Sequence, residues 1–68
     1  MDGIETILRI LEDGSWHSTA ELALRLGWAE SKTEKIVKFL SAHGLVRFQG
    51  KTKSVSLEPE LLALMKEF

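Results

Sequence analysis

Four segments of the chain carry apolar side chains every three or four residues, which is the spacing of an amphipathic helix. We predict helices over about residues 3–13, 18–26, 30–43 and 59–67. Two of their starts carry local signals. Ser18 stands three residues before Glu21, the spacing of a capping box, and Pro59 suits the first turn of a helix. Gly44 supplies the left-handed residue that ends the third helix.

Between the third and fourth predicted helices the apolar spacing becomes alternating, which is typical of half-buried strands. In "LVRFQ", Val46 and Phe48 fall on one face and Arg47 on the other, and "SVSL" alternates in the same way. The residues from 49 to 52, "QGKT", have the length and chemistry of a tight hairpin turn. We therefore predict a hairpin over about residues 45–57.

A short extended segment, "SWH", links the first two helices, so the predicted order is helix, short strand, helix, helix, hairpin, helix. This order indicates a mostly helical α+β fold with a core of three helices, a two-stranded hairpin and a C-terminal helix. A chain of 68 residues with 44% hydrophobic side chains is typical of a small globular protein, and we predict one domain over residues 1–68.

The predicted third helix has one apolar and one basic face when its residues are projected at about 100° each. Four side chains fall on the apolar face: Thr33, Ile36, Val37 and Leu40. The opposite face carries Ser31, Lys32, Lys35, Lys38 and Ala42, with Phe39 beside them. Ser31 stands three residues before Glu34, so we expect Ser31 to cap the helix, with a phosphate contact as the alternative.

The charge of the chain is unevenly distributed along the sequence. The net charge is -1, but residues 31–57 carry six basic side chains against one acidic side chain, a net charge of +5. Residues 1–30 carry a net charge of -4 and residues 58–68 a net charge of -2. A small domain with such opposed charges orients its basic side toward a polyanion.

The same basic stretch contains Gly50-Lys51-Thr52, which matches the end of a phosphate-binding P-loop. The spacing fails, because Leu45 occupies the position of the first glycine and Gly44 stands one residue too early. An alternating segment follows where a P-loop enters a helix. We therefore expect no nucleotide site and interpret the stretch as the tip of the hairpin.

Several other classes of function lack the side chains they need. The chain has no cysteine, and His17 and His43 are too far apart for a local metal motif. No nucleophile stands at a recognisable spacing from a base, so we expect neither an enzyme nor a bound cofactor. No segment has the roughly 18 apolar residues of a membrane span, and no leader pattern begins the chain, so we expect a cytoplasmic protein without membrane contact. Trp16 and Trp28 are expected to pack in the core or at its edge, and His43 to hydrogen-bond at the end of the third helix.

Three consecutive stretches of this sequence resemble the winged helix-turn-helix family. They are "ELALRLG" at 21–27, "SKTEKIVKFLSAHGLV" at 31–46 and "RFQGKTKSVSL" at 47–57. The run from Leu40 through His43 to "GLV" is similar to the passage from helix to wing in the small regulators of the multiple-antibiotic-resistance and arsenic-resistance types. The resemblance implies that the third helix enters the major groove of DNA and that the hairpin, as the wing, touches the backbone or the minor groove.

The resemblance and the basic stretch together imply a transcriptional regulator that binds double-stranded DNA. The candidate DNA contacts are Ser31, Lys32, Lys35, Lys38, Arg47, Lys51 and Lys53. The alternative for these lysines is an ordinary solvated surface. A sequence pI near 6.1 and a third helix without arginine suit a second function equally well, namely a winged-helix module that binds other proteins in a larger assembly.

The two terminal helices both carry apolar faces, and a core this small gains stability from association with a second chain. In the family that the chain resembles, the first and last helices often form a two-fold dimer. The candidate residues for a homodimer interface are Ile4, Ile7, Leu8, Leu61, Leu64, Met65 and Phe68. The alternative is that these side chains pack only within one chain.

Overall fold

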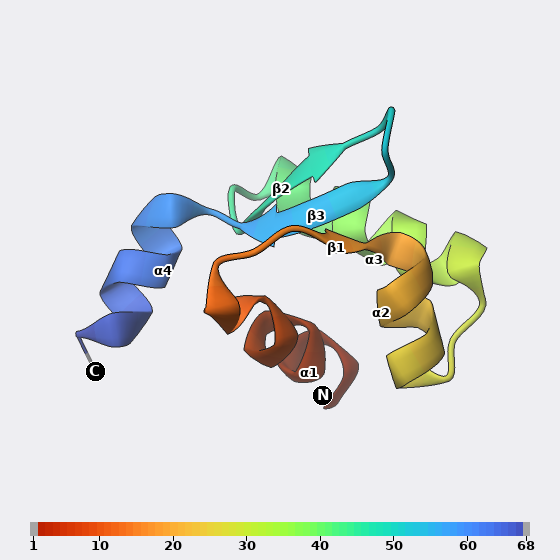
Figure 1. Ribbon diagram of the computed structural model, residues 1–68, viewed down its shortest axis with the longest axis horizontal. Coiled ribbons are helices and arrows are strands. Elements are labelled where there is room, and N and C mark those ends of the chain that lie inside the picture. Colours follow the sequence, from red (N-terminus) through yellow and green to blue (C-terminus); the bar gives the residue numbers. More distant parts are fainter. Residues whose placement is uncertain (1, 68) are drawn as a thin grey trace.

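The protein, described here from a computed structural model of residues 2–67, has four α-helices and one sheet over that range (Figure 1). In chain order the elements are α1 (Asp2–Ile10), the 3-10 turn η1 (Leu11–Asp13), β1 (His17–Ser18), α2 (Thr19–Leu26), α3 (Glu30–Ala42), β2 (Val46–Gln49), β3 (Ser54–Leu57) and α4 (Pro59–Lys66). The fold is therefore a small α+β arrangement. None of these helices has the length and apolar character to cross a lipid bilayer.

The three strands form an antiparallel sheet in the order β1-β3-β2. Val55 of β3 pairs with Phe48 of β2 on one side and with His17 of β1 on the other. β3 is the central strand, and its burial extends to Ser56, which is only 6% exposed. The alternation in "SVSL" therefore does not correspond to one exposed and one buried face of β3.

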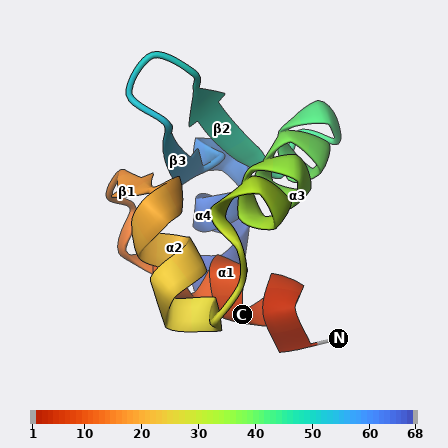
Figure 2. The ribbon, with the colours of Figure 1, turned by 90° about the vertical axis from the view of Figure 1, so that its right-hand side faces the viewer.

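The hairpin turn lies one residue later than the sequence indicated. Gln49 pairs with Ser54, so the turn consists of residues 50–53 and Gln49 belongs to β2. Lys53 closes the turn with φ at 50°, a left-handed conformation that few non-glycine residues adopt. The turn projects beyond the helices in both ribbon views (Figures 1 and 2).

The hydrophobic core draws on the first three helices and on the sheet. Its buried side chains are Ile7, Leu11, Leu22, Val37, Leu40, Val46, Val55 and Leu57. Ile7 is fully buried in this core, so its proposed place in a homodimer interface is wrong: its apolar surface is already covered within one chain. No residue of α4 is buried, although Leu61, Leu62 and Met65 pack against the core at its margin.

The two central helices begin differently. Ser18 caps α2 as expected, because its Oγ accepts a hydrogen bond from the Glu21 N–H at 3.0 Å. The expected cap of α3 by Ser31 is wrong, since Ala29 holds the N-cap position and Ser31 already lies inside the first turn. There Thr33 Oγ1 donates to the Ala29 carbonyl oxygen at 3.0 Å.

The two tryptophans have different environments. Trp28 is half-buried and lies so close to Gly3 of α1 that a Cβ atom at that position would collide with its ring. The link between α2 and α3 is thereby packed onto α1. Trp16 is 46% exposed and is not among the side chains packed against the core, so the expectation that it packs in the core or at its edge is wrong.

Candidate functional site

The seven candidate DNA contacts are all exposed and come from α3 and from the β2–β3 hairpin. Ser31, Lys32, Lys35 and Lys38 lie on α3, Arg47 lies on β2, and Lys51 and Lys53 lie in the hairpin turn. We call this set the α3–hairpin surface. On α3 these residues face away from the buried Thr33, Val37 and Leu40, because side chains three or four positions apart share one side of a helix.

Glu34 joins the two halves of the α3–hairpin surface. Its Oε2 lies 3.3 Å from Lys38 Nζ on the same helix, and its Oε1 lies 3.6 Å from Lys53 Nζ in the hairpin turn. The hydrogen bond from Lys38 and the charge of Lys53 hold the pKa of the Glu34 carboxyl below its ordinary value. Lys38 and Lys53, which are far apart in the sequence, are thus brought together by one carboxylate.

The remaining cations of the surface have other environments. Lys32 Nζ lies 4.7 Å from the centre of the Trp28 ring, a cation–π contact that holds its side chain over the α2–α3 link. Within residues 2–67 the structure shows no ion pair for Lys35, Arg47 or Lys51. Over the same range these three side chains, like Lys32, have no carboxylate in an ion pair that would compete with an external anion.

An aromatic pair lies on the C-terminal part of α3. Phe39 is 58% exposed, and its ring centre is 4.5 Å from that of His43 at an interplanar angle of 52°. In the described part of the chain the His43 ring has this contact rather than the expected hydrogen bond. An exposed aromatic ring beside a basic surface can contact a partner molecule, but single exposed apolar side chains are also common on surfaces that bind nothing.

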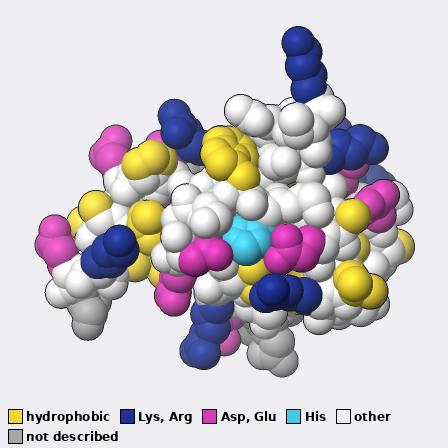
Figure 3. All heavy atoms as spheres, in the orientation of Figure 1, with side chains coloured by type: hydrophobic (Ala, Val, Ile, Leu, Met, Phe, Trp, Pro, Cys, Tyr) yellow, Lys and Arg dark blue, Asp and Glu magenta, His cyan; other side chains and the backbone are white. Residues whose placement is uncertain are grey.

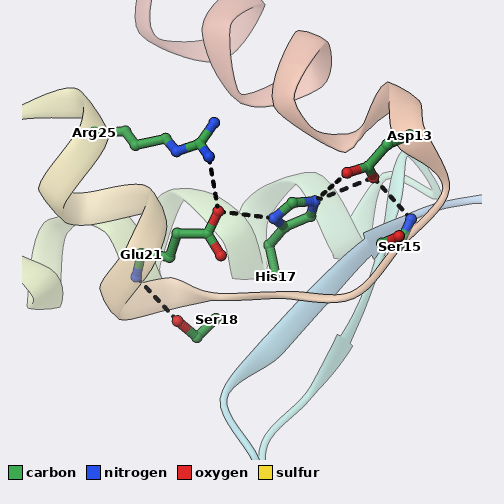
Figure 4. Close-up of polar contacts among 6 residues, drawn as sticks. All are labelled: Asp13, Ser15, His17, Ser18, Glu21 and Arg25. Carbon is green, nitrogen blue, oxygen red and sulfur yellow. Dashed lines mark hydrogen bonds and ion pairs between the residues drawn. The ribbon is translucent and has the colours of Figure 1, made fainter.

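A second polar cluster, which the sequence did not reveal, is formed by residues of η1, β1 and α2 and of the link before β1 (Figure 4). His17 stands between two carboxylates, with Nδ1 2.9 Å from Glu21 Oε2 and Nε2 2.9 Å from Asp13 Oδ2. Arg25 Nη2 lies 3.4 Å from Glu21 Oε2, and the Ser15 N–H donates to Asp13 Oδ1 at 2.8 Å. Figure 3 shows a histidine side chain flanked by acidic side chains on the face that is viewed, and in the same orientation in Figure 1 α3 lies at the back.

Both ring nitrogens of His17 therefore face oxygen atoms that only accept hydrogen bonds. A neutral imidazole has a single N–H donor, so only the imidazolium satisfies both carboxylates. Burial lowers the pKa of His17, but the hydrogen bonds to Glu21 and Asp13 and their charges outweigh it, and the net effect raises this pKa. The Ser15 N–H bond and the contact with His17 lower the pKa of Asp13. Among the described residues no group of three or more His, Asp or Glu side chains is arranged to hold a metal ion.

The His17 cluster predicts a pH-dependent stability. A raised His17 pKa adds stability that is complete below about pH 6.5 and is lost as the pH rises through that pKa. A lowered Asp13 pKa adds stability that is present above about pH 4 and is lost as the pH falls through it. Urea unfolding between about pH 5 and pH 8 is expected to show falling stability in the wild type and a flatter profile in His17→Gln. The matched control is His43→Gln, and an unchanged profile in His17→Gln would contradict this role.

The candidate dimer residues are spread between core and surface. Leu64 is 51% exposed, whereas Ile4, Leu8, Leu61 and Met65 are half-buried against the core. Phe68 lies outside the described residues. A shallow groove beside α4 is lined by Gly44, Leu45, Glu58, Glu60, Leu61 and Leu64. Among the described candidates Leu64 is therefore the exposed one, and α4 is the helix that offers an apolar surface to a second chain.

No protein-family model, no curated protein and no solved structure matched the chain.

Proposed function

We propose that this chain is a winged-helix domain that binds double-stranded DNA and acts as a transcriptional regulator. The observation that carries the proposal is the α3–hairpin surface, where exposed cations from α3 and from the β2–β3 hairpin are joined through Glu34. The net charge of +5 over residues 31–57 contrasts with a negative charge on the rest of the chain. Such a surface is attracted to a polyanion and orients the domain on it.

The arrangement of α2 and α3 supports a helix-turn-helix. The two helices are separated by residues 27–29, and Gly27 adopts a left-handed conformation with φ at 69°. Helix-turn-helix proteins use a turn of about three or four residues that often contains glycine, and their second helix enters the major groove. Here α3 is that helix, and its diameter of about 10–12 Å suits a groove about 12 Å wide.

The types of side chain on the surface indicate how DNA is held. Lysine is a point charge that suits phosphate oxygens, whereas paired contacts with guanine are made best by arginine. Lys35 and Lys51 would neutralise phosphates on either side of the contact, and Arg47 would reach the backbone from β2. A homodimer through the exposed face of α4 around Leu64 would pair two such surfaces on a palindromic site.

Two exposed apolar side chains favour a second candidate function, a module that binds another protein. Phe39 is 58% exposed beside the basic face, and Leu24 on α2 is 84% exposed. In that case a partner should remain bound in salt that abolishes nucleic-acid binding, because apolar contacts depend little on ionic strength. The salt dependence of binding therefore separates the two candidates.

Chemical-shift mapping tests which surface binds. A short duplex added to the ¹⁵N-labelled protein is expected to move the amide signals of α3 and of residues 50–53. The amide signals of α1, which carries none of the candidate contacts, are expected to stay in place and serve as the internal control. Shifts that leave α3 and the hairpin unmoved would contradict the proposal.

A further inference from the structure

Glu34 is the only acidic residue among residues 31–57, and it stands in the middle of the basic surface. Its side chain is 24% exposed, whereas those of Lys38 and Lys53 are each 59% exposed. The carboxylate thus lies beneath the two ammonium groups and uses one oxygen atom for each of them. Two lysines around one anion form the kind of site that a phosphate group would otherwise occupy.

The contact between Glu34 and Lys53 does not rest on flexible side chains alone. The backbone of Lys53 is fixed in the left-handed conformation, and its carbonyl oxygen accepts a hydrogen bond from the Thr19 N–H at 2.9 Å. This bond attaches the end of the hairpin turn to the first residue of α2. The Lys53 side chain therefore extends toward Glu34 on α3 from a backbone that is held in place.

We propose that Glu34 is an internal competitor for phosphate, which holds Lys38 and Lys53 and so weakens binding to DNA of random sequence. The inference rests on the proposed DNA-binding function and concerns the regulation of the same surface. A lysine that is already paired with a carboxylate releases fewer counterions when a phosphate approaches, and it adds less to affinity. The Glu34 charge also repels the phosphate directly.

The cations of the α3–hairpin surface therefore have two different roles in DNA binding. Lys35, Arg47 and Lys51 supply the attraction for any duplex, because no ion pair within residues 2–67 engages them. Lys38 and Lys53 bind phosphates only at a DNA site where α3 fits the groove closely enough to separate the two lysines from Glu34. A restraint of this kind increases the ratio of specific to non-specific affinity.

The first test compares Glu34→Gln with the matched control Glu30→Gln. Both residues lie on α3 and both changes remove one negative charge, but Glu30 is exposed and has no ion pair with the described lysines. Fluorescence anisotropy with a random-sequence duplex is expected to show about tenfold tighter binding for Glu34→Gln than for Glu30→Gln at about 50 mM salt. Its log–log salt slope is expected to steepen by up to about 1.8, the value for two added phosphate contacts.

The second test shows whether the gain acts through the two lysines. The double change Lys38→Gln and Lys53→Gln is expected to cost less affinity in the wild type than in the Glu34→Gln background, because Glu34 already engages both side chains. In the Glu34→Gln background the same double change is expected to remove the tenfold gain. Lys35→Gln is the control and is expected to weaken binding equally in both backgrounds. Circular dichroism and urea unfolding of each variant verify that it is folded.

The outcomes separate this inference from the proposed function. If the wild type binds DNA and Glu34→Gln matches Glu30→Gln, the role of Glu34 is overturned and DNA binding stands. The same holds if the lysine changes cost equally with and without Glu34. If neither the wild type nor Glu34→Gln binds a duplex at low salt, the proposed function fails and the inference fails with it.

Discussion

Replacing Lys35, Arg47 and Lys51 together with alanine is expected to remove most of the salt-dependent affinity for duplex DNA. These side chains have no ion pair within residues 2–67, so each is free to displace a counterion from a phosphate. Three lost contacts lower the log–log slope of affinity against salt by about 2.7. The drop in affinity between about 50 and 200 mM salt should then be about 40-fold smaller than in the wild type.

The matched control removes three cations elsewhere: Arg9, Arg25 and Lys66. Arg9 and Arg25 are already paired with Glu5 and Glu21, and Lys66 lies at the end of α4. This variant has the same net charge as the first one, so a similar loss of affinity in both would mean that DNA responds only to total charge. Equal salt slopes in the two variants would contradict the α3–hairpin surface as the binding site.

Leu22→Ala is expected to destabilise the fold by about 2–5 kcal/mol, the cost of truncating a fully buried leucine. Leu22 is 0% exposed on α2 and belongs to the central core cluster. A chain of this length has a stability of roughly 3–10 kcal/mol, so the loss approaches the whole free energy of unfolding. Urea unfolding followed by circular dichroism measures it.

The same helix supplies the control for this prediction. Leu24 is 84% exposed, and Leu24→Ala removes the same atoms from a position that water already reaches. Its effect is expected to stay within about 0.5 kcal/mol, as for other surface substitutions. Equal losses for the two leucines would mean that α2 is not packed by the face described here.

The sequence predicts the helices of this fold well because their signals are local. The spacing of Thr33, Val37 and Leu40 shows which face of α3 is buried, and the pair Ser18 and Glu21 marks the start of α2. Gly44, with φ at 75°, ends α3 through a backbone conformation that glycine adopts freely. Each of these features depends on residues no more than a few positions apart.

The features that sequence reasoning missed depend on contacts between distant segments. Ser56 alternates with Val55 and Leu57, which predicts an exposed side chain, but it is only 6% exposed in the central strand of the sheet. Ser31 matches a capping box, but the helix starts earlier because Ala29 takes the cap position. Trp16 is expected in the core or at its edge, but it lies in the link before β1, is 46% exposed and is not packed against the core.

In the candidate site, too, the local features were predicted from the sequence and the contacts between distant segments were not. The basic stretch was visible as a run of charge, and its lysines are exposed as expected. The bridging role of Glu34 was hidden, because it requires the hairpin to bring Lys53 beside α3. The spacing of Asp13, His17 and Glu21 could have drawn notice, but the chain turns at Gly14 and leaves the helix, so a four-residue spacing alone indicates no common face.

The most direct test of the central claim is a titration of labelled duplex DNA with the purified protein, followed by fluorescence anisotropy at about 50 and 200 mM salt. The α3–hairpin surface predicts a dissociation constant in the micromolar range or below at the lower salt, with affinity that falls steeply at the higher salt. Absence of binding at the lower salt, or binding that salt leaves unchanged, would contradict the claim that this surface neutralises DNA phosphates.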